Sequence, residues 1–198
     1  MTAGLYPRKR IEAQRVEQNI SSSHRIIWLT SMARPLDCGP APSRFCDGVS
    51  GYGVIYAAPQ FDTAFIETVV RDRFVHRHRR AVPFGDISER GWVELATRTN
   101  EAVVLLDLTG RGCLALGAPT DAVTARNHAA GRALGRAIYR EHEDIDGFLY
   151  SSRLTGADCY AIFDRAVPRL AALGTGELKD HAALAGVLRD QHIGLIRD

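Results

Sequence analysis

The sequence predicts one domain that mixes α-helices and β-strands (α+β), and three observations lead to this fold class. The length of 198 residues is typical of a single domain. Short apolar runs of strand length alternate with two longer segments whose apolar residues recur every three or four positions. A composition of 45% hydrophobic and 24% charged residues is ordinary for a globular fold. The expected order is strand, loop, strand, helix, strand, helix, strand, strand.

The first part of the chain predicts an arm, two strands and a long loop. Residues 1–23 are polar and end in a serine run, so we expect an N-terminal arm or short helix before a domain that spans 24–198. The run HRIIWLT is typical of a strand. The segment SMARPLDCGPAPSRFCDGVSGYG is dense in Pro, Gly and Ser, which indicates a long loop of the kind that is commonly functional. Residues 53–58, GVIYAA, are expected as the second strand.

The segment FDTAFIETVVRDRF predicts an amphipathic helix. Asp62 can cap its first turn, and its apolar residues follow helical spacing: Phe61, Phe65, Ile66, Val69 and Val70. The continuation RDRFVHRHRR is expected as the solvated end of this helix, where cations suit the dipole. The alternative is a contact surface for an acidic partner.

The second half predicts a buried strand, a helix and a pair of strands. The continuous apolar run AVVLLDL, residues 102–108, is typical of a buried strand. Residues 120–143 are expected as one helix with Ala130, Leu134 and Ile138 on one face. The runs IDGFLYSS and CYAIFD predict two strands joined by the turn RLTGAD. Beyond Pro168 we expect a Gly-rich link, a short helix, and HIGLI as a last strand or packed tail.

Charge, cysteines and missing motifs argue against several classes of protein. The net charge of +2 does not by itself indicate nucleic-acid binding. The four cysteines form no Cys-x-x-Cys pair, so we expect no zinc site, no disulfide framework and a cytoplasmic protein. No stretch has the character of a signal peptide or a membrane span. P-loop, G-x-G-x-x-G, G-x-S-x-G and H-E-x-x-H motifs are missing, and HRH at 76–78 is expected as an exposed basic turn.

Several polar residues lie in or beside otherwise apolar elements. Three of them have ordinary structural alternatives: Arg25 as an edge-strand charge, Arg44 as a solvated loop cation, and Tyr56 as a core residue with a paired hydroxyl. Ser151 and Ser152 follow the GFLY strand, where one of them can satisfy backbone groups in a turn.

Glu67 is the most informative of these polar residues. It can pair with Arg71, four positions later, on the helix surface. Its place next to Ile66 brings it close to the buried face, where a carboxylate needs a cation or a ligand. The sequence therefore favours a site near Glu67.

The order HRI, SRF, YGVIYAAPQFDTAFIE, DGFLYSSR and GADCYAIFDR resembles the RES domain, named for its Arg, Glu and Ser and best known as the toxin of a class of bacterial toxin–antitoxin modules. The match runs from about His24 to Arg165. It implies a fold similar to ADP-ribosyltransferase domains, with sheets around an NAD-binding cleft, and an activity that consumes NAD without a metal. Matched residue by residue, the family's arginines, tyrosine, glutamate and serine correspond to Arg25, Arg44, Tyr56, Glu67 and Ser152, with Ser151 as the alternative serine.

The chemistry of NAD cleavage requires such residues. Breaking the nicotinamide–ribose bond builds positive charge on the sugar, which the Glu67 carboxylate would stabilise. Arginine forks bind pyrophosphate, so Arg25 and Arg44 are expected clamps, and Arg153 joins the expected NAD-binding set. Tyr56 would stack on the nicotinamide, and Ser152 would bind its amide or a ribose hydroxyl. Catalysis is thus expected from Glu67, Arg25 and Ser152.

The expected function is a toxin that cleaves NAD with water or phosphate as acceptor, as an NAD glycohydrolase or phosphorylase. The alternative is an ADP-ribosyltransferase toxin that modifies a protein. A third hypothesis is a non-catalytic interaction or nucleic-acid-binding module that uses RDRFVHRHRR. The resemblance also implies an antitoxin of the Xre type that occludes the cleft and carries any DNA contact itself.

Overall fold

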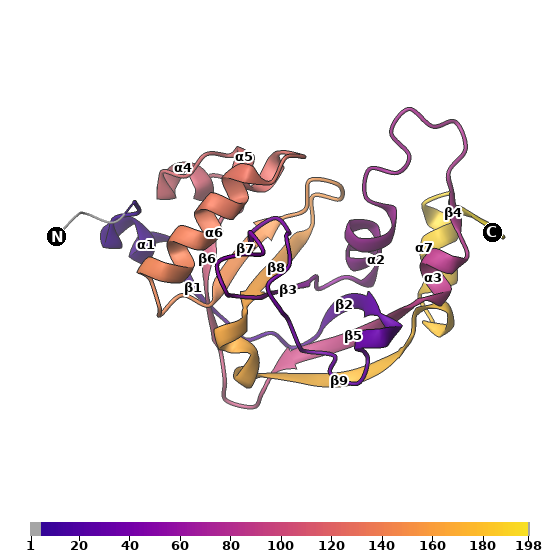
Figure 1. Ribbon diagram of the computed structural model, residues 1–198, viewed down its shortest axis with the longest axis horizontal. Helices are drawn as coiled ribbons and strands as arrows, with labels where there is room; N and C mark the ends of the chain where they lie inside the picture. The colour runs from indigo at the N-terminus through magenta and orange to yellow at the C-terminus, as the bar shows by residue number, and fades with distance from the viewer. Residues whose placement is uncertain (1–4, 198) are drawn as a thin grey trace.

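Three β-sheets carry the fold in the computed structural model, which describes residues 5–197 (Figure 1). The largest sheet has the order β1-β6-β7-β8-β3, with β6 and β7 parallel and the other neighbours antiparallel. Its strands are β1 (Arg15–Gln18), β6 (Val103–Asp107), β7 (Gly147–Ser151), β8 (Asp158–Phe163) and β3 (Val54–Ala57).

The two smaller sheets are built from the remaining strands. An antiparallel sheet has the order β2-β5-β9, with β2 (Ser23–Trp28), β5 (Arg90–Thr97) and β9 (Leu170–Glu177). A parallel pair joins β4 (Ala81–Pro83) to β10 (Gly194–Ile196). His24 and Ala58 exchange backbone hydrogen bonds of 2.7 and 3.0 Å, which join the two larger sheets at the end of β3.

The helices gather in two regions of the molecule. Figure 1 shows α1 (Arg8–Gln14), α4 (Gly112–Leu116), α5 (Asp121–Thr124) and α6 (Ala129–Glu141) together at one side of the largest sheet. At the other end lie α3 (Gly85–Ser88) and α7 (Leu184–Asp190), near β4. Helix α2 (Phe61–Phe65) lies between these regions and continues as a π-helical segment, Ile66–Val70.

The largest sheet is buried on both faces, which explains its continuous apolar runs. In β6, Leu106 enters the main core, which also contains Leu134 and Ile138 of α6. The neighbouring Leu105 enters a second core with Leu95 of β5, between the two larger sheets. Strand β7 is the middle strand of this sheet, and its side chains enter both cores.

The N-terminal segment expected as an arm or short helix is packed onto this sheet. It forms α1, in which Ile11 is fully buried, and then β1, which pairs with β6. Within residues 5–197, none of the helices has the length and apolarity needed to cross a membrane.

The single helix expected over residues 120–143 is wrong. Ala125 has an extended backbone with ψ 149°, which ends α5. The Asn127 side chain then accepts a hydrogen bond from the Ala129 amide at 2.9 Å, which forms a turn directly before α6. The interruption brings the Ala125 carbonyl to the candidate site.

Three further strands, β4, β5 and β9, were not expected from the sequence. The prediction of a Gly-rich link after Pro168 is wrong, because these residues form β9. Strand β5, with its alternating burial, was not expected. The helix expected to run through Phe74 also ends earlier, because Arg71 has φ 50° and leaves the helical path.

Candidate active site

Glu67 lies in a π-helical segment rather than in a regular α-helix. The Arg71 amide donates to the Ile66 carbonyl at 2.7 Å, five residues back, in place of the α-helical bond. Such π-turns occur mostly as single insertions and frequently at functional sites. Glu67 is half-buried at this point.

Ser152 holds the Glu67 carboxylate by a hydrogen bond. The Ser152 hydroxyl donates to Glu67 Oε1 at 2.5 Å. It accepts from the backbone amides of Leu154 and Thr155, both at 3.1 Å. Because the two amides supply their own protons, the hydroxyl proton is directed to Glu67. Ser152 is 3% exposed, so its hydroxyl is shielded from water.

Strand alternation separates the two serines. Phe148 and Tyr150 point into the main core, whereas Leu149 packs against the second core. Ser151 ends β7 and pairs with Asp158, and Ser152 is the serine that reaches Glu67.

Tyr56 and Arg44 belong to a loop packed beside this pair. The Phe45 amide donates to the Tyr56 hydroxyl at 2.8 Å, and Ser43 Oγ is hydrogen-bonded to the same hydroxyl at 2.9 Å. Burial raises the pKa of Tyr56 to about 12. Arg44 is 8% exposed and donates to the Ala125 carbonyl at 3.0 Å. The Tyr56 hydroxyl therefore fixes the loop that carries Arg44.

The buried Tyr150 shows that these residues share one environment. Burial holds the pKa of Tyr150 well above its usual range, the charges of Cys159, Tyr56 and Glu67 act in the same direction, and Arg44 opposes them. Burial and then the Glu67 charge raise the pKa of Cys159 to about 12. Sequence reasoning missed Tyr150 and Cys159, which look like ordinary strand residues.

Arg153 and Arg71 do not pair with Glu67. Arg153 forms an ion pair with Asp72, whose carboxylate also contacts Arg126 at 3.3 Å. The Arg153 hydrogen bond lowers the pKa of Asp72. The alternative pair of Glu67 with Arg71 is not formed. Ser152 is the hydrogen-bond partner of Glu67 within residues 5–197.

Arg25 lies on the other sheet and binds a different segment. Its guanidinium donates to the carbonyls of Pro35 at 2.9 Å and Asp37 at 3.1 Å. Burial lowers the pKa of Arg25. No hydrogen bond within the described part of the chain joins Arg25 to Glu67 or Ser152.

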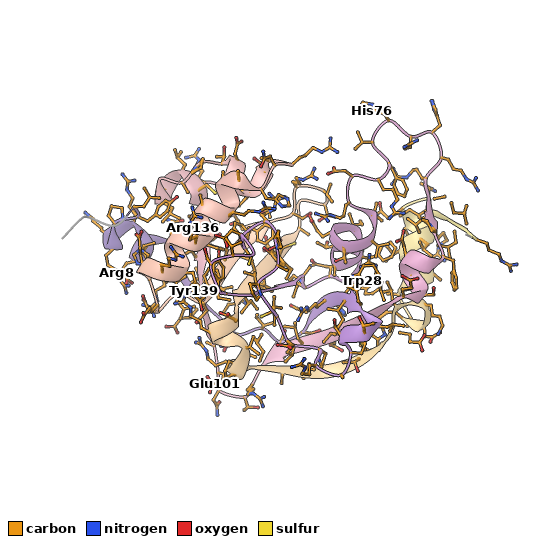
Figure 2. All side chains as sticks on the ribbon, in the orientation of Figure 1. Arg8, Trp28, His76, Glu101, Arg136 and Tyr139 are labelled. Atoms are coloured by element: carbon orange, nitrogen blue, oxygen red, sulfur yellow. The ribbon has the colours of Figure 1, made fainter. Side chains whose placement is uncertain are left out.

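Helix α6 positions the Arg44 loop with a stripe of arginines at intervals of four residues. Arg132 Nε donates to the Ser43 carbonyl at 3.0 Å, Arg136 contacts Asp47 at 3.2 Å, and Arg140 contacts Ser50 at 3.4 Å. Figure 2 labels Arg136 and Tyr139 on this helix.

Two glycines on α6 allow the loop backbone to approach. A Cβ at Gly131 would lie 2.5 Å from the Arg44 carbonyl oxygen, and one at Gly135 would lie 2.0 Å from that of Phe45. The sequence signal was GRALG, two glycines four apart on one helix face.

The charges of four arginines act on His128, which precedes α6. Burial lowers the pKa of His128, and four cations lower it further: Arg44, Arg71, Arg132 and Arg153. Among the described residues, one of these four arginines has a carboxylate partner: Arg153 pairs with Asp72. The surroundings of Arg44 therefore favour an anion.

Metal-binding clusters and disulfides are not seen in the part of the chain that the structure describes. Residues 5–197 contain no group of three or more His, Cys, Asp or Glu side chains placed to hold a metal ion. All four cysteines are free. His76 and His78 are exposed on the loop that follows the π-helical segment.

Comparisons with known proteins identify relatives of this chain. The protein described as "Probable toxin y4kH" from Sinorhizobium fredii (strain NBRC 101917 / NGR234) is 41% identical over 81 residues, which are 41% of this chain and 64% of that protein. The matched part thus spans less than two thirds of that relative.

A solved structure shares the fold. A chain in the crystal structure of the M. tuberculosis MbcT–MbcA toxin–antitoxin complex matches with a TM-score of 0.64, over 86% of this chain and 90% of that chain. The identity is 15%, so the match shows the common fold and confirms the expected mixed α/β architecture. Residues 19–182 match the model of the RES domain. The chain therefore belongs to the RES domain family.

Proposed function

We propose that this chain is the toxin of a bacterial toxin–antitoxin module and that it cleaves NAD at the nicotinamide–ribose bond. The observation that carries the proposal is the hydrogen bond of 2.5 Å between Ser152 and Glu67, beside the arginine-rich surroundings of Arg44. The family and the names of its relatives, a probable toxin and a toxin–antitoxin complex, support the biological setting.

Glu67 is the proposed catalytic carboxylate. The C–N bond between nicotinamide and ribose breaks, nicotinamide leaves with the electron pair, and positive charge develops on the sugar. A carboxylate beside that carbon stabilises this charge. Water or inorganic phosphate then attacks the sugar carbon; water yields ADP-ribose and a proton, and phosphate yields a phosphorylated ADP-ribose.

The other residues have supporting roles in this proposal. Ser152 orients the Glu67 carboxylate, and Arg44 binds the negatively charged pyrophosphate. Arg153 lies next to Ser152 and keeps its proposed place in the anion-binding set. Tyr56 holds the loop through its hydroxyl, with its ring available to the nicotinamide. Arg25 binds the carbonyls of Pro35 and Asp37 and is assigned a positioning role.

The experiment incubates purified protein with NAD, with and without inorganic phosphate, and measures nicotinamide and the ADP-ribosyl product by mass spectrometry. We expect release of nicotinamide, which Glu67→Gln should reduce by about 100- to 1,000-fold because it removes the stabilising charge. Glu101→Gln is the matched control, because it makes the same chemical change at an exposed turn far from α2 (Figure 2). Intact NAD under both conditions would exclude the cleavage.

The acceptor and the partner are tested separately. Labelled NAD in a cell lysate should give free product; label on protein bands would instead indicate transfer to protein. We propose an Xre-type antitoxin that covers the cleft in the cytoplasm. Co-expression of a neighbouring open reading frame should restore growth, and failure of every adjacent frame would count against a toxin role.

A further inference from the structure

A cavity of about 300 Å³ lies between the π-helical segment, the following loop and the residues before β10. Glu67, Ser152 and Arg44 do not line it, whereas Ile66 and Leu154 do, so the cavity adjoins the candidate site without including these three residues. Most of its wall is apolar and comes from four parts of the chain: Ile66, Val70, Phe74, Val75, Leu154 and Ile193. Val75 is 45% exposed, so part of this apolar wall faces solvent.

The rim of the cavity is basic and has few carboxylate partners. Arg71 and Arg80 line the cavity, and neither forms an ion pair within residues 5–197. Asp72 also lines it, but its charge is already matched by Arg126 and Arg153. Residues 71–80 contain five arginines, two histidines and one aspartate. The cavity therefore presents net positive charge around an apolar interior.

The backbone around the cavity has positive φ at three non-glycine positions. Arg71, His76 and His192 have φ of 50°, 58° and 53°. Arg71 lines the cavity, and the other two adjoin the lining residues Val75, Gln191 and Ile193. Histidine and asparagine adopt positive φ more readily than most residues, so the strain is greatest at Arg71, whose ψ is −130°. Strain of this kind persists where a structure is used for binding or switching.

We propose that this cavity binds a partner protein through an acidic segment that carries one or two apolar anchor side chains. Its volume lies at the lower end of the range for binding pockets, roughly 300–1,000 Å³, which suits an anchor of that size. Carboxylates beside the anchor would pair with Arg71 and Arg80, the two rim arginines. Figure 2 shows His76 at the outer tip of the basic loop, where it is accessible to a partner.

The same features favour protein over nucleic acid. A nucleic-acid groove combines cations with aromatic faces on which bases stack. Phe74 is the aromatic residue in this cavity, and the Arg80 guanidinium already covers its ring at 5.0 Å. The remaining wall is aliphatic and matches apolar side chains better than bases.

The test titrates the full-length protein with three labelled peptides and follows fluorescence anisotropy. The probe peptide has the sequence EDELFEDE, the second replaces Leu-Phe with Ala-Ala, and the third replaces the acidic residues with Lys and Arg. We expect saturable binding of the first peptide, at least about tenfold tighter than that of either control. Hydrogen exchange should slow over 66–75 and 191–193 when the probe is bound.

Matched variants separate binding in the cavity from a general effect of the protein's positive charge. Arg80→Glu should weaken probe binding by about tenfold or more, whereas Arg79→Glu, the same change at a neighbour outside the lining, should change it by less than about threefold. Val75→Asp should also abolish binding, with exposed Val49→Asp as its control. Thermal unfolding of each variant checks that it is folded.

Four outcomes would overturn the inference: no saturable binding of the probe up to about 1 mM, equal binding of the Ala-Ala peptide, equal losses in the two arginine variants, or displacement of the probe by a single-stranded DNA 12-mer. These are binding measurements, so they stand or fall independently of NAD cleavage.

Discussion

Gly135→Ala tests how helix α6 places the Arg44 loop. In a helix interior alanine is more favourable than glycine by about 1 kcal/mol. Here the new Cβ would lie 2.0 Å from the Phe45 carbonyl oxygen and 3.1 Å from the Tyr52 hydroxyl. Ordinary contact begins near 3.4 Å, so the loop must retreat by more than 1 Å. Overpacking of this kind costs about 1–3 kcal/mol, which exceeds or cancels the helical gain.

The displaced loop carries Arg44, so the rate of NAD turnover should fall. The loss in rate should be larger than the change in the free energy of unfolding alone would cause. A misplacement of about 1 Å can lower a rate about 100-fold. Stability is measured by urea unfolding and turnover by nicotinamide release. Gly186→Ala in α7 is the control, because its Cβ would meet nothing closer than an arginine side chain at 3.9 Å. The free energy of unfolding of this variant should rise by up to about 1 kcal/mol. If Gly135→Ala is as stable as this control and retains turnover within about twofold of wild type, the reasoning is wrong.

Individual side chains of the site give three further predictions. Ser152→Ala leaves two backbone amides without their acceptor and Glu67 without its donor. The free energy of unfolding, measured in urea, should fall by about 2 kcal/mol, and NAD turnover should fall with it. Unchanged stability would contradict this role. Tyr56→Phe keeps the ring but removes the acceptor of the Phe45 amide. The free energy of unfolding, measured in urea, should therefore fall by about 1–3 kcal/mol. Lost turnover at full stability would instead point to direct contact of the hydroxyl with the ligand. Burial raises the pKa of Cys159 from 9.0 to about 12, so its stabilising effect is present below pH 9 and is lost as pH rises toward 12. Cys159→Ala should flatten the decline of the melting temperature over that range, and equal slopes would contradict the assignment.

Apolar runs predicted β2, β3, β6, β7 and β8, and tertiary contacts explain the errors elsewhere. Strand β9 contains Gly174 and Gly176, which resemble a flexible link in sequence. In the structure, a Cβ at these positions would meet the Trp92 ring at 3.3 and 2.8 Å. The glycines thus make room for an indole on the neighbouring strand, and only the pairing of β5 with β9 shows this.

The candidate site was predicted unevenly for a similar reason. Glu67 and Ser152 were found from their place at the ends of apolar elements and from the family resemblance, and the structure brings them into contact. Arg44 and Tyr56 share the electrostatic environment of Glu67. Arg25 has no hydrogen bond to Glu67 or Ser152 within residues 5–197. The α6 glycines and arginines were missed, because they act on loop carbonyls and a loop hydroxyl and carboxylate about ninety positions away in the chain.

The electrostatic state of Glu67 is the link between this geometry and the proposed chemistry. A carboxylate paired with a guanidinium has much of its charge neutralised, and it would stabilise a developing sugar cation poorly. Of the two nearby candidates, Arg153 pairs with Asp72, and Arg71 turns away from the helix at φ 50°. Glu67 is held instead by a neutral hydroxyl whose direction two backbone amides fix. The arrangement orients the carboxylate while leaving its negative charge available, which is what cleavage of the nicotinamide–ribose bond would require.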